Sequence, residues 1–195
     1  TAMALEIVKE KLDIPVIGVI LPGASSAIQK TKTNKIGVIA TQASIRSDEY
    51  HKTIARKSSA VEVYSLACPK FVSIVESNEM ESEIARKVVS ESLVPLIGKV
   101  DTLILGCTHY PLLRSLIQET MGKEVRLIDS GAEAVRDISV LLNYFSINGQ
   151  ERQPLEHRFY TTAGVNSFRE IAEKWLNIGQ LQIEHTEIEN FNKEK

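Results

Sequence analysis

The chain has 195 residues, 43% of them hydrophobic and 25% charged, so it can bury a substantial core and lies between one large domain and two small ones. Lysine and arginine total 23 against 25 aspartates and glutamates, a net charge of -2. No stretch is basic enough to follow a phosphate backbone, which argues against nucleic acid as a partner. No apolar run approaches the roughly 20 residues that cross a bilayer, and the start does not resemble a signal peptide, so we expect a soluble cytoplasmic protein without membrane contact.

The chain opens on a pattern typical of a helix that is already under way, with Met3, Leu5, Val8 and Leu12 at helical spacing. There is no initiator methionine and no preceding strand, so we expect further sequence upstream of Thr1. Short β-branched runs follow, and most have the character of strands buried on both faces. The predicted strands are Val16–Ile20, Lys35–Ala40, Val61–Ala67, Val100–Gly106, Val125–Asp129 and Arg158–Thr161.

Amphipathic segments alternate with these strands. The predicted helices are Arg46–Lys57, Met80–Leu96, Pro111–Met121, Ala132–Tyr144 and Ser167–Leu176. Alternation of this kind indicates an α/β fold of βα repeats with a mainly parallel sheet. Ligands of such folds bind beyond the carboxyl ends of the strands, where residues 40–42, 67–69, 106–109, 129–131 and 161–162 lie.

Cys107 is the most informative candidate among these strand ends. It follows the apolar run DTLILG and precedes Pro111, a residue favoured in the first turn of a helix. A position near a helix N-terminus favours the thiolate, and His109 is close enough in sequence to assist proton transfer. A free cysteine is more often a small buried hydrophobic residue, but the polar cluster Cys-Thr-His between strand and helix favours a reactive thiol here.

The other candidates have simpler explanations on position alone. Glu76 ends an apolar stretch and faces either a cleft or solvent, with solvent the usual environment of a lone glutamate. Cys68 precedes Pro69 at a strand end, where packing is favoured over reactivity. Thr41 follows KIGVIA, where it either holds a carboxylate or caps a helix. Asp129-Ser130-Gly131 is typical of a helix N-cap, and Glu133 follows Ser130 at the spacing of a capping box.

Four segments together resemble the glutamate racemases of bacterial cell-wall synthesis: IGVIATQASI, VYSLACPKFVSIVE, DTLILGCTHYPLL and LIDSGAE. The resemblance runs through nearly the whole chain, and GCTHYPLL is its most specific motif. It implies two similar doubly wound α/β domains with mainly parallel sheets and an active site in the cleft between them. It also implies cofactor-independent interconversion of L- and D-glutamate with no metal, pyridoxal phosphate or nucleotide, and a homodimer as the common assembly.

Position by position, the resemblance assigns Cys107 as one of two catalytic cysteines and His109 as the histidine that assists it. Glu76 matches the acidic residue associated with this thiol. Thr108 and His109 match substrate contacts, and so does Thr41, although Ala40 and Ser44 stand where glycine and threonine are common in the family. The predicted site is therefore catalytic Cys107, His109 and Glu76, with substrate contacts from Thr41, Thr108 and His109.

The resemblance also implies a domain division. Residues 30–129 are expected to form an inserted second α/β domain, and residues 1–29 and 130–195 the remainder of an incomplete first domain. The first catalytic cysteine would then lie upstream of Thr1, and this chain alone is expected to be inactive.

Three alternatives stay open. The first is a racemase of another amino acid or of hydantoin, which would use the same acid/base catalysis by two opposed cysteines. The second is a thiol phosphatase, because Cys107 and Arg114 bracket a loop between strand and helix, although the spacing is one longer than CxxxxxR and no glycine intervenes. The third is a non-catalytic flavodoxin-like binding module in which Cys107 only packs.

Overall fold

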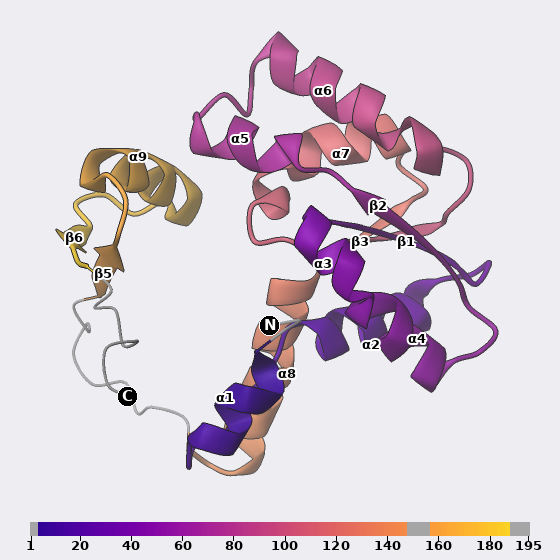
Figure 1. The fold of residues 1–195 in the computed structure, drawn as a ribbon, viewed down its shortest axis with the longest axis horizontal. Helices are drawn as coiled ribbons and strands as arrows, with labels where there is room; N and C mark the ends of the chain where they lie inside the picture. The colour runs from indigo at the N-terminus through magenta and orange to yellow at the C-terminus, as the bar shows by residue number, and fades with distance from the viewer. Residues whose placement is uncertain (1–3, 148–156, 188–195) are drawn as a thin grey trace, which may run out of the picture.

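A four-stranded parallel sheet forms the centre of the molecule, as the computed structural model shows (Figure 1). The structure describes residues 4–147 and 157–187. The strand order is β2-β1-β3-β4, so the first strand in sequence lies inside the sheet. The strands are β1 Lys35–Ala40, β2 Glu62–Ala67, β3 Thr102–Leu105 and β4 Arg126–Asp129.

Helices cover both faces of this sheet, which makes it doubly wound (Figure 1). One face carries α2 Ile20–Lys30 and α4 Glu49–Lys57, and α8 Ser130–Tyr144 packs against α2. The other carries α5 Lys70–Glu76, α6 Glu83–Leu93 and α7 Arg114–Met121, with short 3-10 turns η1 Val94–Leu96 and η2 Tyr110–Leu113 before β3 and α7.

Alternation along the strands explains the two layers. In β3, Leu103 and Leu105 belong to the core against α5, α6 and α7, whereas Ile104 belongs to the core against α2 and α4. Successive side chains of a strand point to opposite faces, so a continuous apolar run is what a strand covered on both sides requires. All four residues of β3 are buried accordingly.

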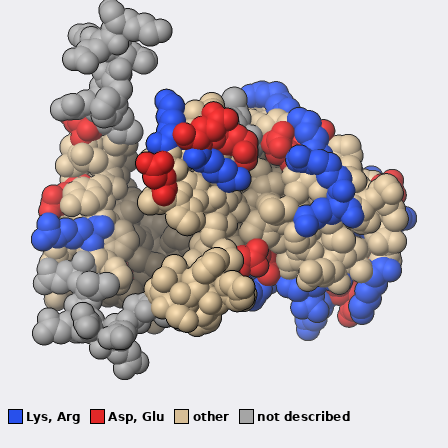
Figure 2. All heavy atoms as spheres, turned by 90° about the horizontal axis from the view of Figure 1, so that it is seen from below, with Lys and Arg blue, Asp and Glu red and all other residues tan. Residues whose placement is uncertain are grey.

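The remaining elements lie outside this sheet. A two-stranded parallel sheet of β5 Arg158–Thr161 and β6 Gln182–His185 packs on α9 Val165–Leu176 through its own small core of Ala172, Leu181 and Ile183. The short helices α1 Leu5–Lys11 and α3 Gln42–Ser47 precede α2 and α4. Figure 2 shows a hollow between the part at the left, which carries β5, α9 and β6, and the rest, with charges of both signs intermingled over this face.

Most predicted elements are present, and the differences have physical causes. The predicted strand Val16–Ile20 is wrong: residues 16–19 form no strand and Ile20 begins α2. No strand within the described ranges pairs with this segment, and an unpaired strand leaves its backbone groups without partners. The helices α2 and α5 were not predicted, because Pro22 and Gly23 in α2 and the continuous apolar run in α5 conceal the helical period.

The division into residues 30–129 and the flanking segments stays a prediction. All four strands of the larger sheet lie within 30–129, and β5 pairs with β6 alone among the described strands. The helix α2, most of which precedes that range, nevertheless packs on the sheet, where its Ala24 and Ala27 are fully buried, and α8 packs against α2. No helix in the described ranges is long and apolar enough to span a membrane.

Candidate active site

The polar residues that follow β1, β2 and β3 meet at one edge because parallel strands all end there. Gly106 donates its N–H to the carbonyl of Ile39 at 2.8 Å, and Cys68 donates to the carbonyl of Ala40 at 3.0 Å. These bonds fix the chain directly before Cys107 against the end of β1. A Cβ added to Gly106 would lie 2.9 Å from the Tyr50 ring and 3.0 Å from the Ile39 carbonyl oxygen, so glycine allows this close approach.

Cys107, His109 and Glu76 form a line of contacts at this edge. The Sγ atom of Cys107 lies 3.7 Å from Nδ1 of His109, and Nε2 of the same ring lies 3.4 Å from Oε1 of Glu76. Glu76 is the last residue of α5 and Cys107 follows β3, so the contact joins two elements. The structure thus brings together the three residues that were predicted to be catalytic, although sequence alone left the direction of Glu76 open.

The two contacts define what the imidazole can do. A carboxylate only accepts hydrogen bonds, so Glu76 favours a proton on Nε2 of His109. The lone pair of Nδ1 then faces Cys107 and can accept the thiol proton, giving a thiolate beside an imidazolium. The hydroxyl of Thr108 lies 3.3 Å from the same Nδ1, which gives that nitrogen a second polar neighbour. Because the Glu76 side chain is 64% exposed, its main effect is to orient the ring and little stability comes from the pair.

A buried aromatic residue supports the loop from behind. Tyr110 donates its hydroxyl proton to the carbonyl of Cys68 at 2.8 Å, and its ring makes an edge-on contact with Phe71 at 5.2 Å between centroids. Burial strongly raises the pKa of Tyr110, so the phenol stays neutral and keeps its donor proton. This bond ties the loop after β3 to the loop after β2.

Tyr50 supports the same loop from the opposite face of the sheet. Its hydroxyl lies 2.9 Å from the hydroxyl of Ser130, and both residues are buried. Burial raises the pKa of Tyr50, the bond to Ser130 lowers it, and the nearby Cys107 and Asp129 raise it further. Sequence reasoning missed this residue because Tyr50 and Ile54, four apart on one helix face, indicate only a core position.

The two cysteines lie in opposite environments. Cys68 is 1% exposed, and burial raises the pKa of its thiol to about 12. It therefore stays a protonated core residue, as its position next to Pro69 favoured. Cys107 is half-buried and sits at the border of the apolar core. Only Cys107 combines access with a neighbouring imidazole.

Thr41 caps a helix. Its side-chain oxygen accepts a hydrogen bond from the N–H of Ser44 at 3.3 Å and lies 3.1 Å from the Ser44 hydroxyl. The capping explanation is therefore confirmed, and a substrate contact by Thr41 stays a prediction. Thr41 follows β1, the neighbour of β3, so it lies at the same sheet edge as Cys107.

The cap of α8 confirms the N-cap predicted at residues 129–131, but not the capping box of Ser130 and Glu133. Asp129 is the N-cap, and its carboxylate accepts hydrogen bonds from the N–H groups of Gly131 and Ala132 at 2.9 and 3.1 Å. Ser130, which the capping-box spacing favoured, is the first helical residue and points into the core toward Tyr50. Glu133 forms ion pairs with Lys30 and Arg136 instead. A buried partner for the serine outcompetes the local cap.

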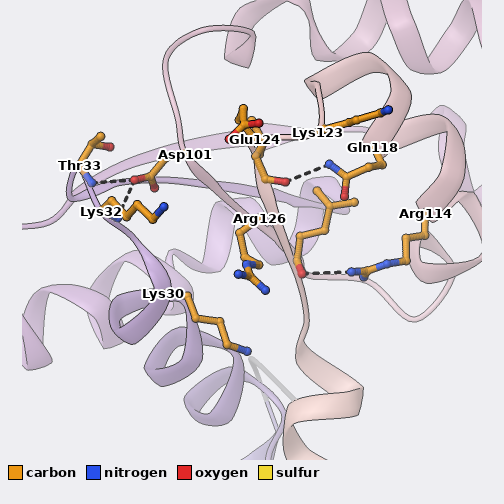
Figure 3. Close-up of a pocket in the computed structure, with 11 residues that line it drawn as sticks. Lys30, Lys32, Thr33, Asp101, Arg114, Gln118, Lys123, Glu124 and Arg126 are labelled. Carbon is orange, nitrogen blue, oxygen red and sulfur yellow. Dashed lines mark hydrogen bonds between the residues drawn. The ribbon is translucent and has the colours of Figure 1, made fainter.

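Arg114 does not serve Cys107. Its guanidinium donates to the carbonyl of Leu127 at 3.3 Å and lines a separate pocket that does not include Cys107 (Figure 3). A phosphatase loop needs its arginine over the thiol, so the thiol phosphatase alternative is wrong.

In the described ranges, histidine, cysteine and carboxylate side chains form no group of three or more suited to one metal ion.

The domain is doubly wound, and a half-buried thiol, an imidazole and a carboxylate lie together at its strand ends. Such a site is suited to proton transfer. The family model for Asp/Glu/Hydantoin racemase matches residues 1–138. This match covers more than half of the chain, so the chain belongs to the Asp/Glu/Hydantoin racemase family.

Similar proteins carry a narrower name. A protein named glutamate racemase from Lactococcus lactis subsp. cremoris is 90% identical over all 195 residues, which cover 72% of its length. The glutamate racemase of Streptococcus gordonii is 63% identical over 96% of this chain and 71% of its own length. These relatives are thus longer than the chain.

Solved structures agree with the fold. A glutamate racemase isoform from Bacillus anthracis has a TM-score of 0.88 at 41% identity, covering 96% of this chain and 70% of that one. The glutamate racemase of Francisella tularensis in complex with D-glutamate has a TM-score of 0.83 at 35% identity, covering 99% and 71%. The predicted fold class is confirmed.

Proposed function

We propose that this chain interconverts L- and D-glutamate, as part of a longer protein, by thiol acid/base catalysis. The contact line Cys107–His109–Glu76 at the carboxyl edge of a parallel sheet carries the proposal. The names of the relatives, at 90% and 63% identity, support glutamate as the substrate.

Racemisation requires removal of the α-proton from one face of the substrate and delivery of a proton to the other. Two groups in opposite protonation states are needed, and their roles exchange with the direction of reaction. In the proposal, Cys107 serves one face, and His109 takes its proton when the thiolate form is required. Cys68 is unsuited to the other face because it is buried and protonated, so the proposal takes the opposing thiol from outside these 195 residues.

The α-proton of an amino acid is a weak acid, so the site must also stabilise the developing negative charge. Donors that are fixed before the reaction and protected from water do this best. We assign this part to Thr108 and Thr41, whose hydroxyls follow β3 and β1. His109 contacts the substrate in the same proposal, and no metal or organic cofactor takes part.

The resemblance to glutamate racemases also implies a cellular role and an assembly for the protein. D-glutamate formed here supplies peptidoglycan synthesis in the cytoplasm, and the protein acts as a homodimer without nucleic acid or membrane partners. Light scattering after size-exclusion chromatography measures the assembly directly, and a monomer at micromolar concentration would contradict the homodimer.

A substrate panel tests the proposed activity. The longer protein that carries this chain is incubated separately with L-glutamate, L-aspartate and a 5-substituted hydantoin, and each enantiomer is separated by chiral chromatography. We expect D-glutamate formation at a rate about a hundredfold or more above that for the others, because a fixed side-chain pocket discriminates strongly when its polar groups lose a partner. Faster turnover of aspartate or hydantoin would favour the alternative substrates of the family.

A further inference from the structure

A pocket lies at the opposite end of the sheet from Cys107. It has a volume of about 480 Å³ and is lined by residues that precede or begin β1, β3 and β4 (Figure 3). Asp101 directly precedes β3 and Arg126 begins β4, so the strands separate this pocket from the candidate active site at their other ends. The proposed racemisation uses none of its residues.

Positive charge dominates the lining. Five basic side chains face two carboxylates, those of Asp101 and Glu124. In Figure 3 the side chains of Lys30 and Arg126 extend toward the same space, and Arg114 extends toward β4 from the side. The basic residues are Lys30, Lys32, Arg114, Lys123 and Arg126.

The two carboxylates of the pocket compensate this charge only in part. Asp101 accepts hydrogen bonds from the Thr31 hydroxyl at 2.6 Å and from the N–H groups of Lys32 and Thr33 at 2.7 and 2.6 Å. Burial alone would raise the pKa of Asp101, but these bonds together lower it to about 2. Its oxygens are thus occupied by the Thr31 hydroxyl and two backbone N–H groups, and neither Asp101 nor Glu124 forms an ion pair with a basic residue in the described ranges.

Most of the basic side chains have a free charge. Lys32, Lys123 and Arg126 form no ion pair with any described residue, whereas Lys30 pairs with Glu133 on α8 at 3.1 Å. Arg114 uses one N–H on the Leu127 carbonyl and keeps further donors for other groups. Like charges gathered in one hollow repel each other, so a bound anion would stabilise the arrangement.

Hydrogen bonds hold the segments that carry these charges in place. The Gln118 amide donates to the carbonyls of Gly122 and Val125 at 2.8 and 2.9 Å, which fixes the turn that contains Lys123. Asp101 fixes the segment of Lys32 and Thr33 in the same way. Since the backbone of the pocket is already ordered, a ligand would have to immobilise only the ends of the side chains.

We propose that this pocket binds a multiply charged phosphate group, either free as pyrophosphate or as part of a nucleotide. Arginine matches phosphate with paired hydrogen bonds, and lysines add compact charges around it. The surplus of basic side chains requires an anion with more than one charge. A single carboxylate, such as that of an amino acid, would leave most of them uncompensated.

Calorimetric titration of the protein tests the proposal with pyrophosphate, inorganic phosphate, ADP and acetate. We expect saturable binding of pyrophosphate or ADP to one site per chain, at least about tenfold tighter than phosphate and far tighter than acetate. Tighter ADP than pyrophosphate would identify a nucleotide, and the reverse a free polyphosphate. Equal binding of acetate, or no saturation by any phosphate at millimolar concentration, overturns the proposal.

Matched variants locate the site. Arg126→Gln combined with Lys123→Gln should weaken pyrophosphate binding about tenfold or more, because two charge-assisted contacts are lost. Lys57→Gln removes an exposed lysine outside the pocket and should leave the affinity within about twofold. Equal weakening by Lys57→Gln, or tighter binding of oligonucleotides in proportion to their length, would show a diffuse surface effect and no pocket. Thermal melts monitored by circular dichroism confirm that all variants are folded.

Discussion

The Nε2 atom of His109 lies 3.4 Å from Oε1 of Glu76, and this contact turns the opposite nitrogen of the ring toward the Cys107 thiol. The glutamate therefore acts on the reaction through the orientation and tautomer of the imidazole. It touches neither the thiol nor, in the proposed mechanism, the substrate.

Replacing Glu76 should affect turnover more than folding. We expect Glu76→Gln to lower kcat about tenfold or more in the longer protein, because the NH2 of an amide can also donate to Nε2 and no longer fixes the tautomer of His109 as a carboxylate does. KM and the unfolding free energy should change little, since the side chain is 64% exposed. Glu79→Gln, at an exposed position close in sequence, is the control, and an equal loss in both variants would contradict the orienting role.

The two thiols should differ sharply in reactivity. Iodoacetamide at neutral pH is expected to modify Cys107 and leave Cys68 intact, because Cys68 is 1% exposed with a pKa of about 12. Peptide mass spectrometry after timed quenching measures each site, and both should react in denaturant. Resistance of Cys107 in the folded protein would favour a purely packing cysteine.

The buried bond between Tyr50 and Ser130 should stabilise the sheet. Tyr50→Phe and Ser130→Ala are each expected to cost about 1–2 kcal/mol of unfolding free energy, because each removes one hydroxyl of the pair and leaves the other buried without a partner. The double variant should cost less than the sum of the two, with a coupling of about 1 kcal/mol. Urea unfolding measures all three, and Tyr144→Phe, at a 79% exposed position, should change nothing. Full additivity would contradict a direct bond.

Asp101 should make the unfolding free energy depend on pH in the acidic range. Its folded pKa of about 2 lies below the ordinary value of 3.8, so its contribution is complete above about pH 4 and is lost as the pH falls toward 2. Asp101→Asn should therefore destabilise the protein by about 1–2 kcal/mol at pH 7 and hardly at all near pH 2. Urea unfolding at both pH values checks the sign, and a constant difference would exclude the titration.

Periodicity alone predicted much of the sheet. Lys35–Ala40 and Arg158–Thr161 match observed strands at both ends, because short β-branched and aromatic runs between turn signals have few alternative structures. Val16–Ile20 has the same composition but forms no strand, since pairing depends on a neighbour that local sequence does not reveal. The proline and glycine of α2 concealed a helix whose small residues allow close packing on α8: a Cβ at Gly23 would lie 2.2 Å from the Ser130 hydroxyl.

Within the candidate site, contacts inside one loop could be predicted from the sequence, whereas contacts between distant segments could not. Cys107 and His109 are two residues apart, so their contact could be expected from a single loop. The contact of Glu76 depends on how α5 packs beside η2, and local sequence favoured solvent for this residue. Tyr50 and Ser130 are 80 residues apart, and nothing in either segment indicates the partner.

Replacing the Cys107 sulfur by oxygen tests whether this thiol transfers the α-proton of glutamate. The longer protein and its Cys107→Ser variant are incubated with L-glutamate in D₂O, and D-glutamate and deuterium at the α-carbon are followed by chiral chromatography and NMR. We expect rapid D-glutamate formation by the parent protein and a loss of about a thousandfold or more in the variant, because a hydroxyl is too weak an acid to exchange protons near neutrality. Sustained D-glutamate formation by a folded Cys107→Ser variant would contradict the assignment of this thiol.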